Sequence, residues 1–130
     1  MTALPPEDVA FLTERYPGHV VTVEAGMVCV VIPGWFVPAG FSHRSVDLLL
    51  RLVPGFPDVP PDMWWTVPTL TLASGRPVPA ADLQEVHLGR TWQRWSRHLP
   101  AGAWASGKDT LQSYLAQVRT ELERTAAEAA

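Results

Sequence analysis

The chain has 130 residues, of which 47% are hydrophobic and 18% charged, and its formal net charge is -3. This composition excludes a disordered chain, and the length fits a single domain, which we place at residues 1–124 with a tail at 125–130. The acidic balance gives no general attraction to nucleic acid or to an anionic membrane, so we expect neither as a partner.

The first part of the chain predicts a helix followed by antiparallel strands. Apolar residues at helical spacing, after two prolines suited to a first turn, predict a helix over residues 5–16. Alternating residues 19–24 and the β-branched run 28–32, joined by Ala25-Gly26, predict a hairpin. Alternation over 45–52 and aromatic content over 63–67 predict two further strands. These four segments predict an antiparallel meander.

The second half is expected to be irregular until a final helix. Residues 74–82 have the composition of a surface loop that is ordered by packing. Ser106 and Asp109 are placed as a capping pair for a helix whose apolar residues recur from Leu111 to Leu122. The tail from Thr125 has no apolar stripe and is expected to fray. Because the last helix must cover the apolar face of the meander, the fold class is α+β.

The segment Phe56-Pro57-Asp58-Val59-Pro60-Pro61 follows the third strand, and its prolines stiffen the exit from the sheet without backbone donors. It is similar, position for position, to the Tyr/Phe-Pro-x-x-Pro-Pro turn of the ubiquitin-conjugating (UBC) superfamily. This resemblance implies a UBC-like fold: an N-terminal helix, a four-stranded antiparallel meander, an irregular Pro/Trp-rich segment and a C-terminal helix packed on the sheet.

Further along the chain, GRTWQRWSRH at residues 89–98 is followed by Trp104, Gly107, Asp109 and SYL at 113–115. With these residues the chain resembles prokaryotic UBC family E over residues 4–124. The resemblance implies a role in a bacterial ubiquitin-like conjugation system, with a ubiquitin-like protein and a ThiF-type activating enzyme as partners and genes for a JAB-type peptidase nearby. We expect no cofactor.

Relatives carry the modifier as a thioester on the cysteine of a Gly-x-x-Cys segment, but here Gly89-Arg90-Thr91-Trp92 places tryptophan at that position. An indole is neither a nucleophile nor a leaving group in acyl transfer. The single cysteine, Cys29, excludes an intrachain disulfide and a cysteine zinc site, and lies in an apolar strand where we expect a packed, unactivated thiol. With no secretory signal or membrane-length apolar run, we expect a cytoplasmic protein.

Two hydroxyls near the displaced site are candidate acyl carriers. Thr91 or Ser96 would carry the modifier, with His98 or His87 as the base, if a hydroxyl lies within about 3 Å of a ring nitrogen. The histidines have no metal-ligand spacing, so we expect no metal site.

If residues 90–99 are helical, Trp92, Trp95 and Leu99 share one face, and Arg90, Arg94 and Arg97 share the opposite one. One interpretation is that the tryptophans anchor the segment to the core and the arginines are solvated. The other is that the segment forms a docking surface, because Arg and Trp dominate interface hot spots. We therefore predict a UBC-like component that receives or positions the modifier's activated C-terminus, or a non-catalytic adaptor that binds the modifier or its activating enzyme. Trp64 and Trp65, adjacent on a strand, are expected to face opposite sides of the sheet.

Overall fold

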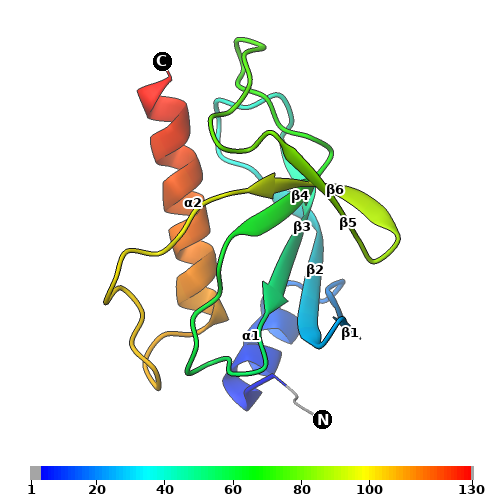
Figure 1. Cartoon of the computed structure of the whole chain (residues 1–130), viewed down its shortest axis with the longest axis vertical. Helices are drawn as coiled ribbons and strands as arrows, with labels where there is room; N and C mark the ends of the chain where they lie inside the picture. The colour runs from blue at the N-terminus through cyan, green and yellow to red at the C-terminus, as the bar shows by residue number, and fades with distance from the viewer. Residues whose placement is uncertain (1–3, 130) are drawn as a thin grey trace.

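The computed structural model describes residues 4–129 and contains two helices and one six-stranded sheet (Figure 1). The helices are α1 (Pro6–Arg15) and α2 (Leu111–Glu128). The sheet is antiparallel, in the order β1-β2-β3-β4-β6-β5, and its strands are β1 (Val20–Glu24), β2 (Met27–Phe36), β3 (Ser45–Leu52), β4 (Trp64–Val67), β5 (Leu83–His87) and β6 (Arg90–Trp95). The α+β class is confirmed, and the sheet is wider than the predicted four strands.

Strands β1 to β4 form the meander that the alternation predicted. Ala25 and Gly26 connect β1 to β2 with positive φ angles of 53° and 77°, as a two-residue hairpin turn requires. β2 continues to Phe36, with a register shift between Ile32 and Trp35. β3 covers the predicted residues, so the sequence pattern placed this half of the sheet well.

The segment predicted to be irregular contains a second hairpin, formed by β5 and β6, so the helical arrangement considered for residues 90–99 does not occur. Leu88 and Gly89 both have positive φ and make its two-residue turn. β6 also pairs with β4, with Trp64 opposite Trp95. Periodicity alone was misleading because tryptophans spaced by three residues fall on opposite faces of a strand, where each finds its own apolar environment.

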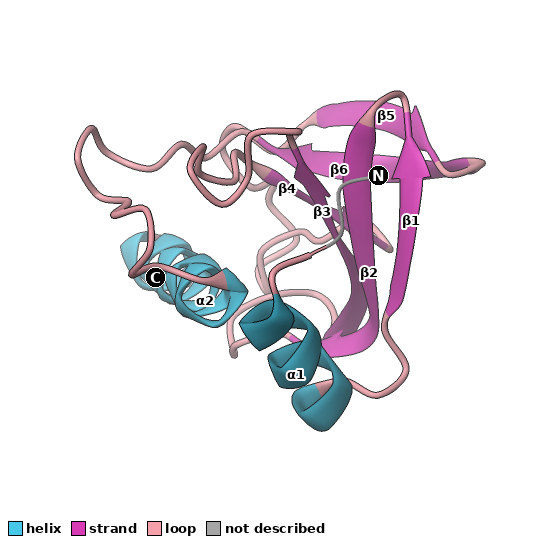
Figure 2. Cartoon of the chain, turned by 90° about the horizontal axis from the view of Figure 1, so that it is seen from below, coloured by secondary structure: helices cyan, strands magenta, loops and turns pink. Residues whose placement is uncertain are grey.

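Both helices cover one face of the sheet, which we call the inner face (Figure 2). Leu12 of α1 and Leu111, Val118 and Leu122 of α2 are fully buried there. The Asp8 carboxylate of α1 accepts a hydrogen bond from the Leu111 backbone N–H at 3.0 Å, which ties α1 to the start of α2. The inner face is therefore the main core, as predicted for a helix packed on the sheet.

The ends of α2 differ from the predicted ones. Its capping box is formed by Thr110 and Ser113. Of the predicted capping pair, Asp109 instead accepts a hydrogen bond from the Ala105 N–H at 2.7 Å, and Ser106 donates to the Asp58 carboxylate. At the other end the helix continues through Glu128, with Thr125 buried against the core. The helix therefore includes residues 125–128 of the tail that was expected to fray, and Ala130 lies outside the described residues.

The second face of the sheet, which we call the outer face, carries a smaller apolar cluster. The sheet curls so that the β5–β6 hairpin lies across β2 and β3 (Figure 1). Beneath it lies the outer cluster, whose buried members are Cys29, Leu49, Trp65 and Trp92. The prediction that adjacent tryptophans face opposite sides is confirmed, because Trp64 belongs to the inner core and Trp65 to the outer cluster.

The connection between β4 and β5 is irregular but packed, as predicted. Leu70, Leu72 and Val78 are buried in the main core. The buried Gln93 side chain on β6 holds the connection through hydrogen bonds with the Leu70 N–H and carbonyl, at 2.8 and 3.0 Å, and with the Ala81 carbonyl at 2.9 Å. Within residues 4–129, no helix has the length and apolar character needed to cross a membrane.

Candidate functional site

The proline-rich turn is joined to the segment that precedes α2. Phe56 is buried and packs against Trp104, with ring centroids 6.1 Å apart. The Trp104 indole N–H donates to the Pro57 carbonyl at 2.8 Å, and Ser106 donates to the Asp58 carboxylate. The turn and the downstream tryptophan, both used to recognise the family resemblance, therefore form one structural unit.

Trp92, which the family resemblance was expected to place at the thiol position, is fully buried in the outer cluster. Its indole N–H donates to the His87 carbonyl at 2.9 Å, across the hairpin. The Arg90 guanidinium lies over its ring, 4.8 Å from the centroid. The side chain is satisfied in both its polar and apolar parts, and it stabilises the hairpin.

Cys29 is fully buried in the same cluster, as its apolar strand predicted. Burial raises the pKa of its thiol, and this effect exceeds the opposing hydrogen bond and charge of Arg51. Arg51 lies directly opposite Cys29 in the β2–β3 register. Sequence reasoning missed this cation because it considered only residues close in the chain.

The candidate carrier hydroxyls are not paired with a histidine in the described residues. Ser96 Oγ accepts a hydrogen bond from Arg94 Nε at 3.2 Å. Thr91 is exposed near the tip of the β5–β6 hairpin. His98 Nδ1 instead lies 2.6 Å from Asp62 Oδ1, with both side chains exposed. The structure therefore assembles a His98–Asp62 pair and leaves the two hydroxyls apart from it.

The strand divides the predicted arginine and tryptophan stripes between the two faces. Arg90 and Arg94 lie on the outer side with Trp92, where Arg90 pairs with Asp47 at 2.9 Å. Arg97, just past β6, pairs with Glu121 of α2 at 3.1 Å and lies over the Trp95 ring. The partner surface predicted from the sequence is therefore divided between two environments, with Arg90, Trp92 and Arg94 in one and Trp95 and Arg97 in the other.

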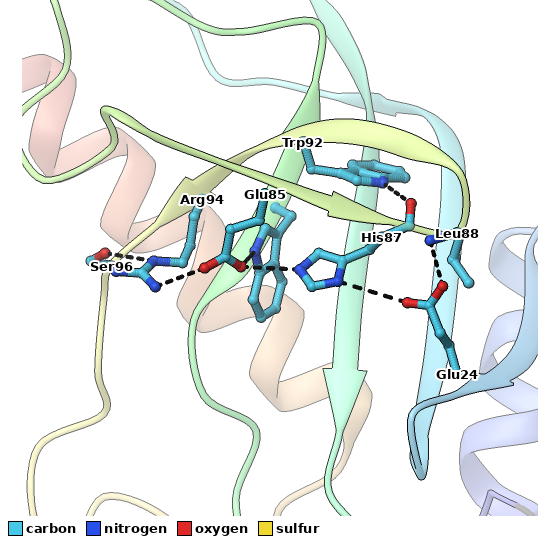
Figure 3. Close-up of polar contacts among 8 residues, drawn as sticks. Glu24, Glu85, His87, Leu88, Trp92, Arg94 and Ser96 are labelled. Atoms are coloured by element: carbon cyan, nitrogen blue, oxygen red, sulfur yellow. Dashed lines mark hydrogen bonds and ion pairs between the residues drawn. The ribbon is translucent and has the colours of Figure 1, made fainter.

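The outer side of the hairpin carries a polar cluster that the sequence did not predict (Figure 3). Glu85 accepts hydrogen bonds from Trp65 Nε1 at 2.9 Å, from Arg94 at 2.9 Å and from His87 Nε2 at 3.0 Å. Burial raises the pKa of Glu85, but these hydrogen bonds and the Arg94 charge outweigh it and hold the pKa below its ordinary value. Residues 83–87 (Leu-Gln-Glu-Val-His) do not alternate between apolar and polar, so the sequence carried no strand signal that would place Glu85 and His87 on one face.

The free edge of the hairpin exposes apolar side chains. Val86 is 69% exposed and Leu83 is 48% exposed, and they project from opposite faces of the edge strand β5, on either side of its free edge. The Arg90 side chain, which is 43% exposed, lies at the tip of this hairpin, beside the Leu88-Gly89 turn. An edge strand with exposed apolar residues and an arginine has the composition of an interaction surface.

No significant match is found among curated proteins or among solved structures. The comparison with known protein families matches residues 4–125, nearly the whole described chain, to one family. That family is described as prokaryotic E2 family E, and the chain belongs to it.

Proposed function

We propose that this chain is a UBC-like component of a bacterial ubiquitin-like modification system, and that it receives or positions the modifier's activated C-terminus. The observation that carries the proposal is the match to prokaryotic E2 family E over residues 4–125. The partners that follow from it are a ubiquitin-like protein and a ThiF-type activating enzyme.

The β5–β6 hairpin is the surface we assign to the modifier. Its edge strand leaves backbone groups unpaired, and Val86 and Leu83 are the exposed apolar side chains beside them. Arg90 adds a half-exposed cation that an acidic partner residue can share with Asp47. Arg94 and Trp92 serve this surface indirectly, because they are held within the hairpin by Glu85 and His87.

Binding of the purified modifier, measured by calorimetry, tests the surface. Val86→Asp and Arg90→Glu are expected to weaken binding about thirtyfold or more each, the range of interface hot spots. Val59→Asp and Arg44→Glu introduce the same changes at exposed loop positions and are expected to have no effect. Equal loss in both pairs of variants would show that net charge, rather than the hairpin, governs binding. Loss of activating-enzyme binding alone would assign the hairpin to that enzyme.

A non-catalytic adaptor is the second candidate, and the burial of Trp92 and Cys29 favours it. Trp92 occupies the expected thiol position, and the Cys29 thiol is enclosed beneath the hairpin. Chemistry by Thr91 or Ser96 would need His98 to leave Asp62, or His87 to leave Glu85, and approach a hydroxyl.

Incubation with activating enzyme, modifier and ATP separates the two candidates by mass spectrometry. An acyl carrier forms a covalent adduct that disappears in one of Ser96→Ala, Thr91→Ala or Cys29→Ala. An adaptor forms no adduct, and pathway output persists in all three variants while Val86→Asp lowers it. An adduct that survives all three substitutions would require another nucleophile and would contradict the assigned residues.

A further inference from the structure

The tips of two hairpins that are far apart in the strand order meet on the outer face. The Leu88 backbone N–H, in the β5–β6 turn, donates to Glu24 Oε2 at 2.8 Å. Glu24 ends β1, next to the β1–β2 turn, and its other oxygen lies 3.7 Å from His87 Nδ1 (Figure 3). These contacts close the curled sheet over the outer cluster.

His87 lies between two carboxylates at this junction. Its Nε2 is 3.0 Å from Glu85 Oε1, and its Nδ1 faces Glu24. The ring packs edge-on against Trp65, with centroids 5.5 Å apart, and the side chain is only 12% exposed. A neutral imidazole carries one N–H, whereas the protonated ring carries an N–H on each nitrogen and a positive charge. Only the protonated ring therefore suits both carboxylates at once.

We propose that His87 is a pH-sensitive clasp, which holds the β5–β6 hairpin over the outer cluster when protonated and loosens it when neutral. Protonation gives a histidine ring a positive charge and a second N–H donor, which is why histidines serve as pH-dependent switches. The proposal concerns a conformational device and stands whether or not the pathway role is correct.

The charges on the surrounding strands favour this assignment. Glu85 already has a cation, Arg94 of β6, on its second oxygen at 2.9 Å. Among the described residues Glu24 has no ion-pair partner other than His87, so protonation supplies the cation that Glu24 lacks.

The remaining charged groups near the clasp have other partners or lie further from the ring. Arg90 of β6 pairs with Asp47 of β3. The Arg51 guanidinium of β3 lies over the ring of Trp65, 5.7 Å from its centroid. β4 contributes the neutral Trp65, and β2 contributes the Cys29 thiol within the cluster. Glu24 and Glu85 are thus the charged groups that contact His87 directly.

Cys29 provides a built-in reporter of the clasp. It is the only cysteine of the chain and is fully buried in the cluster that the hairpin covers. Lifting of the hairpin removes Trp92 from this cluster and exposes the thiol to a reagent. The rate of thiol labelling therefore measures how often the hairpin opens.

The experiment measures labelling of Cys29 in the folded full-length chain by a neutral maleimide from pH 5.5 to 8.5. Dividing each rate by that of the urea-unfolded chain at the same pH removes the ionisation of the thiol itself. We expect the ratio to rise about three- to tenfold over this range, as for loss of one partly exposed charge-assisted interaction. Repeating the measurement in low concentrations of urea distinguishes hairpin opening, which exposes little surface and depends only weakly on urea, from global unfolding.

Three variants complete the test. In His87→Gln the ratio of folded to unfolded labelling rates should not change with pH. Glu24→Gln should reduce the pH dependence of this ratio, although its side chain can still accept the Leu88 N–H. His98→Gln alters the exposed histidine paired with Asp62 and should leave the response intact. A flat wild-type ratio, a response that persists in His87→Gln, or labelling with the full urea dependence of unfolding would each overturn the clasp. Hydrogen exchange of the Leu88 amide gives a second readout of the same opening.

Discussion

The two faces of the sheet are stabilised in different ways. The inner face is covered by α1 and α2 and depends on extensive apolar burial, which is lost only when the domain unfolds. The outer face is closed by a hairpin, a small apolar cluster and a set of ion pairs at its margin. A region with few buried contacts opens at lower free energy than the global core. The outer face is therefore where we expect local motion and regulation.

The tryptophans show how one chain supplies both faces. Trp64 and Trp95 stack on the inner face with centroids 5.9 Å apart, and the Trp95 N–H donates to Thr66 Oγ1 at 3.0 Å. Trp65 and Trp92 occupy the outer cluster and donate to the hairpin itself, to Glu85 and the His87 carbonyl. Similar side chains thus stabilise the whole domain on one side and a single hairpin on the other.

Trp95→Ala is expected to have the largest effect. It removes a fully buried indole from the main core and should lower the free energy of unfolding by about 4 kcal/mol. Urea denaturation followed by circular dichroism measures the loss. Trp92→Ala is the matched change on the outer face and should cost less, because the hairpin can lift without unfolding the helices. Equal losses would remove the distinction between the faces.

Gln93→Leu tests the polar part of the inner face. The change keeps the side-chain size but leaves the buried Leu70 N–H and the Leu70 and Ala81 carbonyls without their partner. We expect a loss of about 2–3 kcal/mol, typical of buried groups left unsatisfied. Gln84→Leu, at the opposite register position on the exposed strand β5, is the control and should be nearly neutral in urea denaturation.

The sequence predicted the parts of the fold that depend on local periodicity. β3 and the first hairpin follow from alternation, and the apolar stripe from Leu111 to Leu122 identifies α2. The second hairpin was missed because tryptophans three residues apart suit either a helix or a strand packed on both faces. Only the cross-strand pairing of Trp95 with Trp64 decides between them, and pairing is not encoded locally.

The candidate site was predicted less well than the fold, because its contacts are long-range. Glu24 and His87 are distant in sequence but meet at the junction of the hairpins. Arg51 lies opposite Cys29 in the pairing of β2 with β3, and the sequence alone does not determine the register of that pairing. The burial of Cys29 needed no such information, since an apolar strand is sufficient to predict it.

Asp8 links the two helices and is expected to have a moderate effect. Asp8→Ala leaves the buried Leu111 N–H unpaired and should cost about 1–2 kcal/mol. Burial raises the pKa of this carboxyl, and the Leu111 hydrogen bond only partly offsets it. Because the pKa of Asp8 is higher in the folded chain, the stabilisation by its protonated form is fully present below the pKa of the unfolded chain. This stabilisation is lost as the pH rises through the pKa of the folded chain. Asp8→Asn keeps the acceptor without the charge, so at pH 7 it should equal or exceed wild-type stability in urea denaturation.

Glu85 is expected to give the smallest effect, with the opposite sign. Because its pKa is lowered in the folded chain, its stabilisation is present above the unfolded pKa and is lost as pH falls through the folded value. Acid below about pH 4 should therefore loosen the hairpin by roughly 0.5–1 kcal/mol. Amide hydrogen exchange of β5 and β6 from pH 5.5 to 3 measures this change. Glu85→Gln should abolish this acid-induced increase in exchange, whereas Glu123→Gln, on the exposed side of α2, should retain it. An increase that survives Glu85→Gln would assign the loosening to another carboxylate, of which Glu24 is the nearest.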